Sequence, residues 1–109
     1  MRKYPPIPNN ADQENEALYS PLRTVLEEAY NQSAKGKGKR RHSNGKPFNS
    51  QPIMEIARMV GVGYHTGQAM KKCQEATTMA SRDEHEAAIN ELLGAIVYCA
   101  AAVLLIREK

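Results

Sequence analysis

Six cationic side chains crowd into twelve residues of this chain, and they are its clearest candidates for chemistry. They are Lys35, Lys37, Lys39, Arg40, Arg41 and Lys46. No acidic residue lies between Glu28 and Glu55, and the chain as a whole carries only +3, so the residues outside this segment sum to −3. Cations this close together add their fields and attract phosphate groups. The basic segment, Lys35 to Lys46, therefore predicts a site for a phosphate-bearing ligand.

The residue types in and after the basic segment indicate how such a ligand would be held. Arginines make bidentate contacts with phosphate, lysines supply point charges, and His42 adds a charge when it is protonated. Tyr64 and His65 follow a glycine-containing turn and are predicted to hold a base or a sugar. The alternatives are that the segment is a solvated charged stretch and that both histidines are ordinary polar residues.

Patterns for catalysis or metal binding do not appear in the sequence. A phosphate-binding P-loop fails because Pro47 follows Lys46 and Arg40 stands where a glycine is required. Cys73 and Cys99 lack metal-ligand spacing and are interpreted as small buried side chains in a reducing compartment. We therefore expect no catalytic residue, no metal and no cofactor.

The elements that must position these residues are predicted to be helices, which makes the fold class all-α. A Pro-rich, polar arm (1–19) precedes one helical domain (20–109), which contains a basic loop (33–50). Hydrophobic periodicity predicts helices over about 21–32, 52–60, 64–80 and 83–107, and the last two should form an antiparallel hairpin in a small bundle.

Finer features of these helices are also predicted. Ser20, Ser50 and Ser81 stand where N-caps are expected. The glycines at 61 and 63 should end the second helix and separate it from the third. The third helix should bury a stripe made of Ala69, Met70, Cys73, Ala76 and Met79.

The last helix contains 15 successive residues, Leu92 to Ile106, that are apolar on every side. A membrane span needs about 20 such residues, so we expect this helix to be surrounded by protein. The other helices are too short to cover it, which predicts a homo-oligomer through Leu92–Ile106; the alternative is the central helix of a monomeric bundle. Without a signal-peptide pattern, the expected location is cytoplasmic, with no membrane partner.

Two segments carry a resemblance to known proteins. KPFNSQPIMEIARMVGVG, from Lys46 to Gly63, and HEAAINELLGAIVYCAAAVLLIRE, from His85 to Glu108, resemble small all-helical accessory proteins of tailed bacteriophages. They are also similar to the phage dATP/dGTP diphosphohydrolase-type family. That family has an Arg-His pair after LLGA, where this chain has Ile96, Val97 and Tyr98, so the resemblance implies a nucleotide theme without catalysis.

These observations lead to one functional hypothesis and two alternatives. The first is a non-enzymatic protein that binds a phosphate-bearing nucleotide as a homo-oligomer. If it is phage-encoded, it would work in the host cytoplasm and sequester a host signalling nucleotide as an anti-defence protein. The second is a nucleic-acid-binding accessory protein that uses the same basic loop. The third is a divergent nucleotide pyrophosphohydrolase.

Overall fold

The computed structural model describes residues 15–35 and 45–109, and within these ranges it contains helices and no strand. The elements are α2 (Ser20–Ala34), the short 3-10 helix η1 (Phe48–Ser50), α4 (Pro52–Val60), α5 (Gly63–Ser81) and α6 (His85–Arg107). The all-α prediction is confirmed, and the expected helix bounds are correct to within two residues. The N-terminal arm up to residue 14 and the centre of the basic loop, 36–44, lie outside the described residues.

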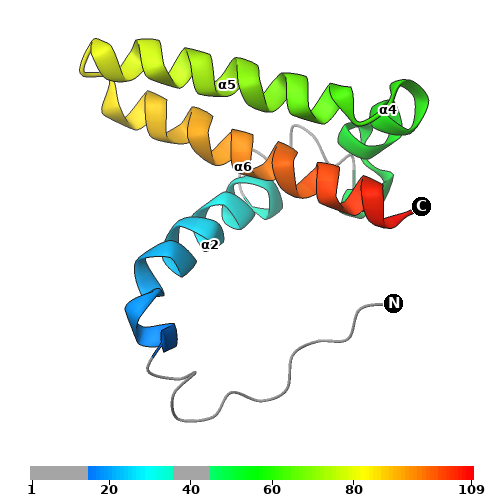
Figure 1. Cartoon of the computed structure of the whole chain (residues 1–109), viewed down its shortest axis with the longest axis horizontal. Coiled ribbons are helices and arrows are strands. Elements are labelled where there is room, and N and C mark those ends of the chain that lie inside the picture. The colour runs from blue at the N-terminus through cyan, green and yellow to red at the C-terminus, as the bar shows by residue number, and fades with distance from the viewer. Residues whose placement is uncertain (1–14, 36–44) are drawn as a thin grey trace.

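An antiparallel hairpin of α5 and α6 forms the body of the molecule (Figure 1). The two helices are joined by a tight turn in which Asp83 has a positive φ of 59°. The side of α6 that faces the interior is rich in small residues: Ala88, Gly94, Ala95, Ala101 and Ala102 are all buried. Small side chains let two helix axes approach closely, so the composition of α6 explains how the hairpin packs.

The open end of the hairpin is closed by α4 and η1. Met54 and Ala57 of α4 pack against Ala101 and Leu105 of α6, and Met54 is completely buried. Phe48 packs against this cluster and so anchors the chain that follows the basic segment to the core. Burying a side chain the size of methionine stabilises a fold by about 1.5–3 kcal/mol.

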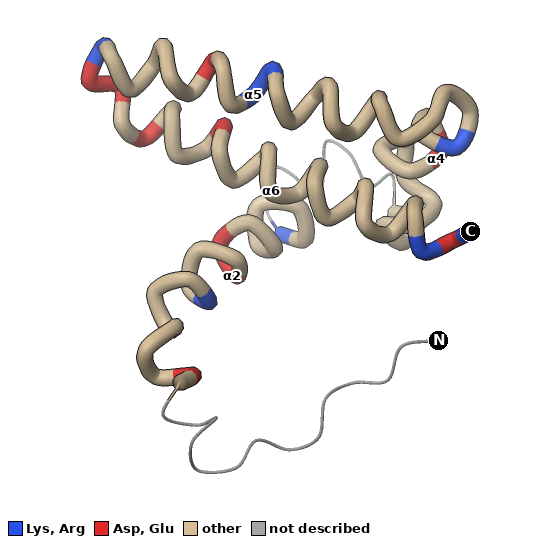
Figure 2. Tube along the Cα trace, in the orientation of Figure 1, with Lys and Arg blue, Asp and Glu red and all other residues tan. Residues whose placement is uncertain are grey.

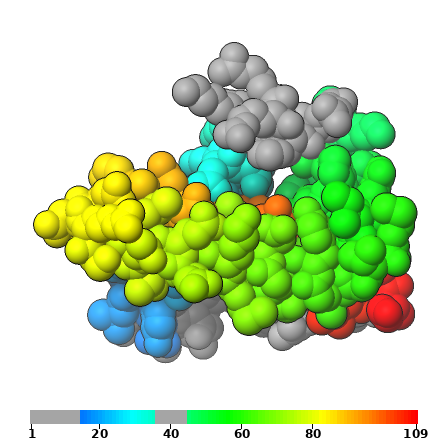
Figure 3. Space-filling model, turned by 90° about the horizontal axis from the view of Figure 1, so that it is seen from above, coloured from blue at the N-terminus to red at the C-terminus, as the bar shows by residue number. Residues whose placement is uncertain are grey.

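The turn between α4 and α5 depends on a glycine. Gly61 has a φ of 102°, a conformation that residues with a side chain rarely adopt. Its N–H donates to the carbonyl of Ala57 at 2.7 Å, which ends α4, and α5 begins two residues later. Figure 3 shows α5 running across one face of the molecule, with α4 at the end away from the α5–α6 turn.

α2 leaves the hairpin at an angle and contacts it through its C-terminal half (Figure 1). Ala29 is its one buried residue, and Gln32 donates its side-chain N–H to the carbonyl of Asn90 at 2.9 Å. The apolar stripe on the rest of the helix is exposed, with exposed fractions between 41% and 76%: Leu18, Leu22, Val25, Leu26 and Tyr30. Within the described part of the chain, this stripe lacks a covering partner.

The three predicted serine caps are wrong. Helical hydrogen bonding already runs through Tyr19, which bonds Asn15 and Arg23, so Ser20 lies inside a helix. Ser50 belongs to η1, and Gln51 stands at the start of α4. Ser81 is the last residue of α5, and its hydroxyl donates to the carbonyl of Thr78 at 2.6 Å. None of the three side chains makes a cap hydrogen bond.

Some residues predicted to be buried are exposed. Met70 is 67% exposed, and both cysteines are exposed free thiols. The reason is that α5 packs against α6 through the row containing Ala69 and Ala76. The side of α5 that carries Met70 and Cys73 faces away from α6 and is exposed.

Candidate functional site

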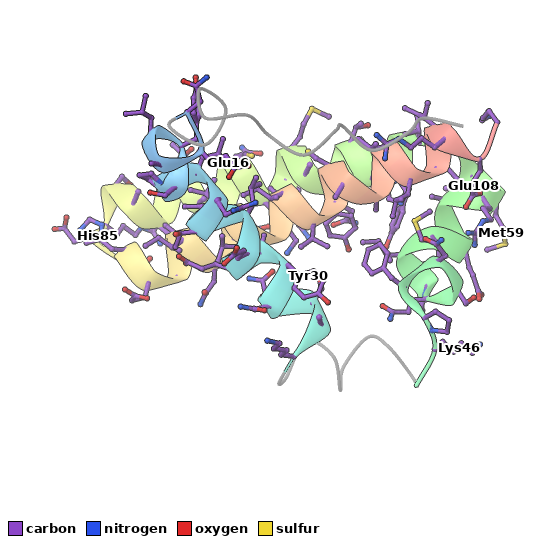
Figure 4. All side chains as sticks on the ribbon, turned by 90° about the horizontal axis from the view of Figure 1, so that it is seen from below. Glu16, Tyr30, Lys46, Met59, His85 and Glu108 are labelled. Carbon is purple, nitrogen blue, oxygen red and sulfur yellow. The ribbon has the colours of Figure 1, made fainter. Side chains whose placement is uncertain are left out.

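The two ends of the basic segment lie within the described residues. Lys35 follows the last residue of α2, and Lys46 precedes η1; both are exposed. The C-terminal end of α2 and Lys46 project from the same edge of the molecule (Figure 4). The other predicted phosphate ligands, Lys37, Lys39, Arg40, Arg41 and His42, lie outside the described residues. The fold therefore brings the start and the end of the segment to one edge, beside the α5–α6 hairpin.

His65, predicted to contact a base or a sugar, is a core residue. Its side chain is completely buried, and Nε2 lies 2.7 Å from the carbonyl oxygen of Ile53. A carbonyl can only accept a hydrogen bond, so Nε2 carries the proton and donates it. Nδ1 is buried as well and has no hydrogen-bond partner among the described residues. His65 thus joins the start of α4 to the first turn of α5.

Tyr64, His65 and Tyr98 form a cluster of aromatic rings between α5 and α6. The rings of Tyr64 and Tyr98 meet edge to face at 6.0 Å between centroids, and those of His65 and Tyr98 are 6.4 Å apart. Burial, and then a hydrogen bond with Tyr64, raise the pKa of Tyr98 to about 12. Tyr98 therefore stays protonated near neutral pH. The ring contacts join α5, which carries Tyr64 and His65, to α6, which carries Tyr98.

Lys72 connects α5 to α6 beside this cluster. Its Nζ lies 3.4 Å from a carboxylate oxygen of Glu91 and 5.9 Å from the centre of the Tyr98 ring. Its stem crosses Gly94, where an added Cβ would lie 3.1 Å from Cδ of Lys72. Sequence reasoning missed this contact; the signal was a single glycine in the middle of an apolar helix.

Two of the surface hollows formed by the described residues lie away from Lys35, Lys46, Tyr64 and His65. One, of about 470 Å³, is lined by Gln74, Glu75, Thr78, Met79, Arg82 and Glu84. The other, of about 520 Å³, lies between the end of α4 and the end of α6 and includes Arg58 and Glu108. Neither is lined by Lys35, Lys46, Tyr64 or His65. Among the described residues, no group of three or more His, Cys, Asp and Glu side chains could hold a metal ion.

By length and composition alone, α6 could cross a membrane. Its most apolar 18-residue window is only 33% buried within the chain. Core helices of water-soluble proteins have the same length and composition, so this property does not assign a location. It does show that much of α6 is left uncovered by the described part of the chain.

Comparison with known proteins identifies no relative of this chain. No known protein family, no curated protein and no solved structure matches the chain. The resemblance to phage accessory proteins and to the dATP/dGTP diphosphohydrolase-type family therefore stays a prediction from the two segments that carry it.

Proposed function

We propose that this protein binds a phosphate-bearing ligand through the basic segment and performs no chemistry on it. The observation that carries the proposal is the charge pattern: six cations in twelve residues, on a chain whose remainder is net negative. Such a local excess concentrates positive potential where a phosphate group can meet several donors at once. The exposed positions of Lys35 and Lys46, at one edge of the fold, support it.

The first ligand class is a nucleotide. Lys39, Arg40 and Arg41 would hold its phosphates, and His42 would add a donor. The base would be held by residues other than His65, because that side chain already bonds Ile53 in the interior. In an infected cell, a homo-oligomer of this kind would lower the free concentration of a host signalling nucleotide.

The second ligand class is nucleic acid, and one observation favours it. The partners predicted for a base or sugar, Tyr64 and His65, are engaged in helix packing. Binding to a phosphate backbone needs cations and no pocket. The same segment is therefore suited to a polynucleotide without any further site.

A salt titration separates these two classes. We would measure fluorescence anisotropy with labelled mononucleotides and with labelled single strands and duplexes. If all six cations contact phosphates of a single strand, log K should fall with log salt at a slope of about −4. A nucleotide site should instead discriminate among nucleotides, ignore duplexes and show a shallower slope.

A triple variant tests the segment itself. Replacing Lys39, Arg40 and Arg41 with glutamine should weaken binding of whichever ligand is found by at least about tenfold, since several charge-assisted contacts are lost. Unchanged affinity would end the proposal.

The matched control neutralises three exposed cations elsewhere: Arg23, Lys71 and Arg82, all replaced by glutamine. Both triple variants lower the net charge from +3 to zero, so a loss confined to the first assigns binding to the segment and not to overall charge. Incubation with deoxynucleotides and Mg²⁺ or Mn²⁺ should give no turnover; turnover would establish the enzymatic alternative.

A further inference from the structure

An apolar seam, exposed at every position except the half-buried Ile96, runs along α6 from Ile89 to Ile106. Its members are spaced 3, 4, 3, 4 and 3 residues apart: Ile89, Leu92, Ile96, Cys99, Val103 and Ile106. The exposed fractions of Ile89, Leu92, Val103 and Ile106 lie between 44% and 59%, and Cys99 is exposed as well. A repeat close to 3.5 residues is the pattern by which two helices pack along their length in a coiled coil.

The seam faces away from the rest of the hairpin. At about 100° per residue, its members lie on the side of α6 opposite Gly94, the residue that contacts Lys72 of α5. From Ile89 to Ile106 the seam extends about 25 Å. Six apolar side chains at coiled-coil spacing over about five helical turns, five of them exposed, are more than scattered surface residues require.

We propose that the seam binds the α6 helix of a second copy of this chain, with the two helices antiparallel. The intervals between seam residues, 3, 4, 3, 4 and 3, are the same from either end of the seam. Two antiparallel copies related by a two-fold axis can therefore place every seam residue opposite another seam residue. Reversing one helix about the midpoint sets Ile89 against Ile106, Leu92 against Val103, and Ile96 against Cys99. Each contact is then made twice, as in an isologous interface.

Charge selects the antiparallel arrangement over the parallel one. The N-terminal end of α6 and the preceding turn carry Asp83, Glu84 and Glu86 together with Arg82, a net charge of −2, since the charge of Glu91 is offset by Lys72. The C-terminal end of α6 carries Arg107 and Lys109 (Figure 2). The charge of Glu108 is offset by Arg58, which lies 2.7 Å away. Antiparallel helices bring the acidic end of one copy to the basic end of the other and oppose their dipoles, whereas parallel helices would place like ends together.

The seam alone is smaller than a standard interface, which buries about 800 Å² on each partner. The second copy must therefore also cover neighbouring apolar surface, and the exposed apolar side chains of α2 can supply it. The pairing of α6 helices does not depend on ligand binding, and it supplies an interface for the homo-oligomer expected from the sequence.

Directed cross-linking tests the arrangement. In a background without native thiols (Cys73→Ser, Cys99→Ala), Ile89→Cys and Ile106→Cys are prepared as separate proteins, mixed, and mildly oxidised. In the antiparallel pair, positions 89 and 106 meet, whereas the two copies of either position are about 25 Å apart. Disulfide-linked dimers should therefore form in the mixture and not in either protein alone. Cross-links within each protein alone, or none in the mixture, would overturn the proposal.

A second measurement does not rely on thiols. Native mass spectrometry should show that Leu92→Glu/Val103→Glu is monomeric, with its helical circular dichroism retained. The matched control, Met59→Glu/Met70→Glu, changes side chains that are 78% and 67% exposed and lie outside the seam, and it should keep the oligomeric state of the parent chain. A parent chain that is monomeric in solution, or that floats with phosphatidylcholine–phosphatidylglycerol vesicles through the seam, would refute the second-copy proposal.

The cross-linking also separates this proposal from ligand binding. The variant that lacks Lys39, Arg40 and Arg41 should still cross-link in the mixed experiment. If ligand affinity is lost while cross-linking is retained, the proposed α6–α6 interface is still supported. If cross-linking is absent while ligand binding depends on Lys39, Arg40 and Arg41, the proposed phosphate site is still supported.

Discussion

At the scale of single residues, His65 is the one polar side chain buried in the described core. It is completely buried, and its one hydrogen bond joins α4 to α5 at 2.7 Å. A buried polar group left without a partner costs free energy, and Nδ1 is such a group among the described residues. The Nε2 bond and the packing against Tyr64 and Tyr98 must offset that cost.

We expect His65→Ala to lower the free energy of unfolding by about 2–4 kcal/mol, because it leaves a cavity and an unbonded Ile53 carbonyl. Urea unfolding followed by circular dichroism measures the change. His85→Ala is the control, because its side chain is 71% exposed, and it should change stability by less than about 0.5 kcal/mol. Equal effects of the two variants would show that His65 is not a core residue.

Tyr98 gives a prediction for alkaline pH. Its pKa is about 12 in the folded chain and near 10 when unfolded. Between these values the unfolded chain has lost a proton that the folded chain keeps. The contribution of Tyr98 to the free energy of unfolding is therefore complete below about pH 10 and declines as the pH rises toward 12. Tyr98→Phe removes this contribution, and its stability should fall less than that of the parent between pH 9 and 12. Tyr30→Phe, at an exposed position, should follow the parent curve; parallel curves for all three proteins would contradict the prediction.

At the scale of elements, the α5–α6 contact contains a glycine that makes room for a lysine. An alanine at position 94 should gain about 1 kcal/mol of helix propensity. Its methyl group would also press on Lys72, at 3.1 Å from Cδ, and loosen the contact with Glu91. The gain in helix propensity is therefore opposed by the contact with Lys72 only in a chain that still carries the lysine side chain.

A double-mutant cycle separates these effects. Gly94→Ala should stabilise a Lys72→Ala chain by about 0.5–1 kcal/mol and stabilise the parent by clearly less, which gives a measurable coupling energy. Thermal and urea unfolding of the four proteins provide the values. An identical gain in both backgrounds would mean that Lys72 does not depend on the space beside Gly94.

A bidentate ion pair between Arg58 and Glu108 joins the ends of α4 and α6. Nε and Nη2 of Arg58 donate to the two carboxylate oxygens of Glu108 at 3.0 and 2.7 Å, and this hydrogen bonding, with the added charge attraction, lowers the pKa of Glu108. A lowered folded-state pKa gives stability that is present above the unfolded value of 4.5 and lost as pH falls below it.

Glu108→Gln should therefore lower the urea midpoint modestly at pH 7, and the difference from the parent should shrink below about pH 4. Glu28→Gln, an exposed change on α2, is the control and should show no such convergence. A difference from the parent that is independent of pH would show that the ion pair is not its source.

The elements themselves were predictable because each depends on local chemistry. Periodic apolar residues set the helices, and Gly61 set the break between α4 and α5, as the positive φ confirms. Burial was not predictable to the same degree, because it depends on which helix faces which. Met70 and Cys73 fit the stripe of α5, yet the hairpin uses only the row with Ala69 and Ala76. The burial of His65 was missed for the same reason: its partner, Ile53, lies on another helix.

At the scale of the whole molecule, the described part of the chain is an α5–α6 hairpin capped by α4, from which the amphipathic helix α2 projects. α4, α5 and α6 share the cluster around Met54, while α2 depends on Ala29 and on the Gln32–Asn90 hydrogen bond. Elements with few buried contacts open at lower free energy than the rest of a fold. The basic segment follows directly from α2, so the stability of α2 affects how the proposed phosphate ligands are presented.

The weak attachment of α2 can be tested by detaching it. Ala29→Glu places a charge at a position that is 2% exposed, and burying an unpaired charge is too costly for α2 to stay docked. Hydrogen exchange of the variant should show α2 amides exchanging at least about tenfold faster, while α5 and α6 keep their protection. Tyr30→Glu, at a 67% exposed position on the same helix, should leave exchange unchanged. Global loss of protection in Ala29→Glu would instead mean that α2 folds as one cooperative unit with the hairpin, so that the edge carrying the basic segment is as stable as the core.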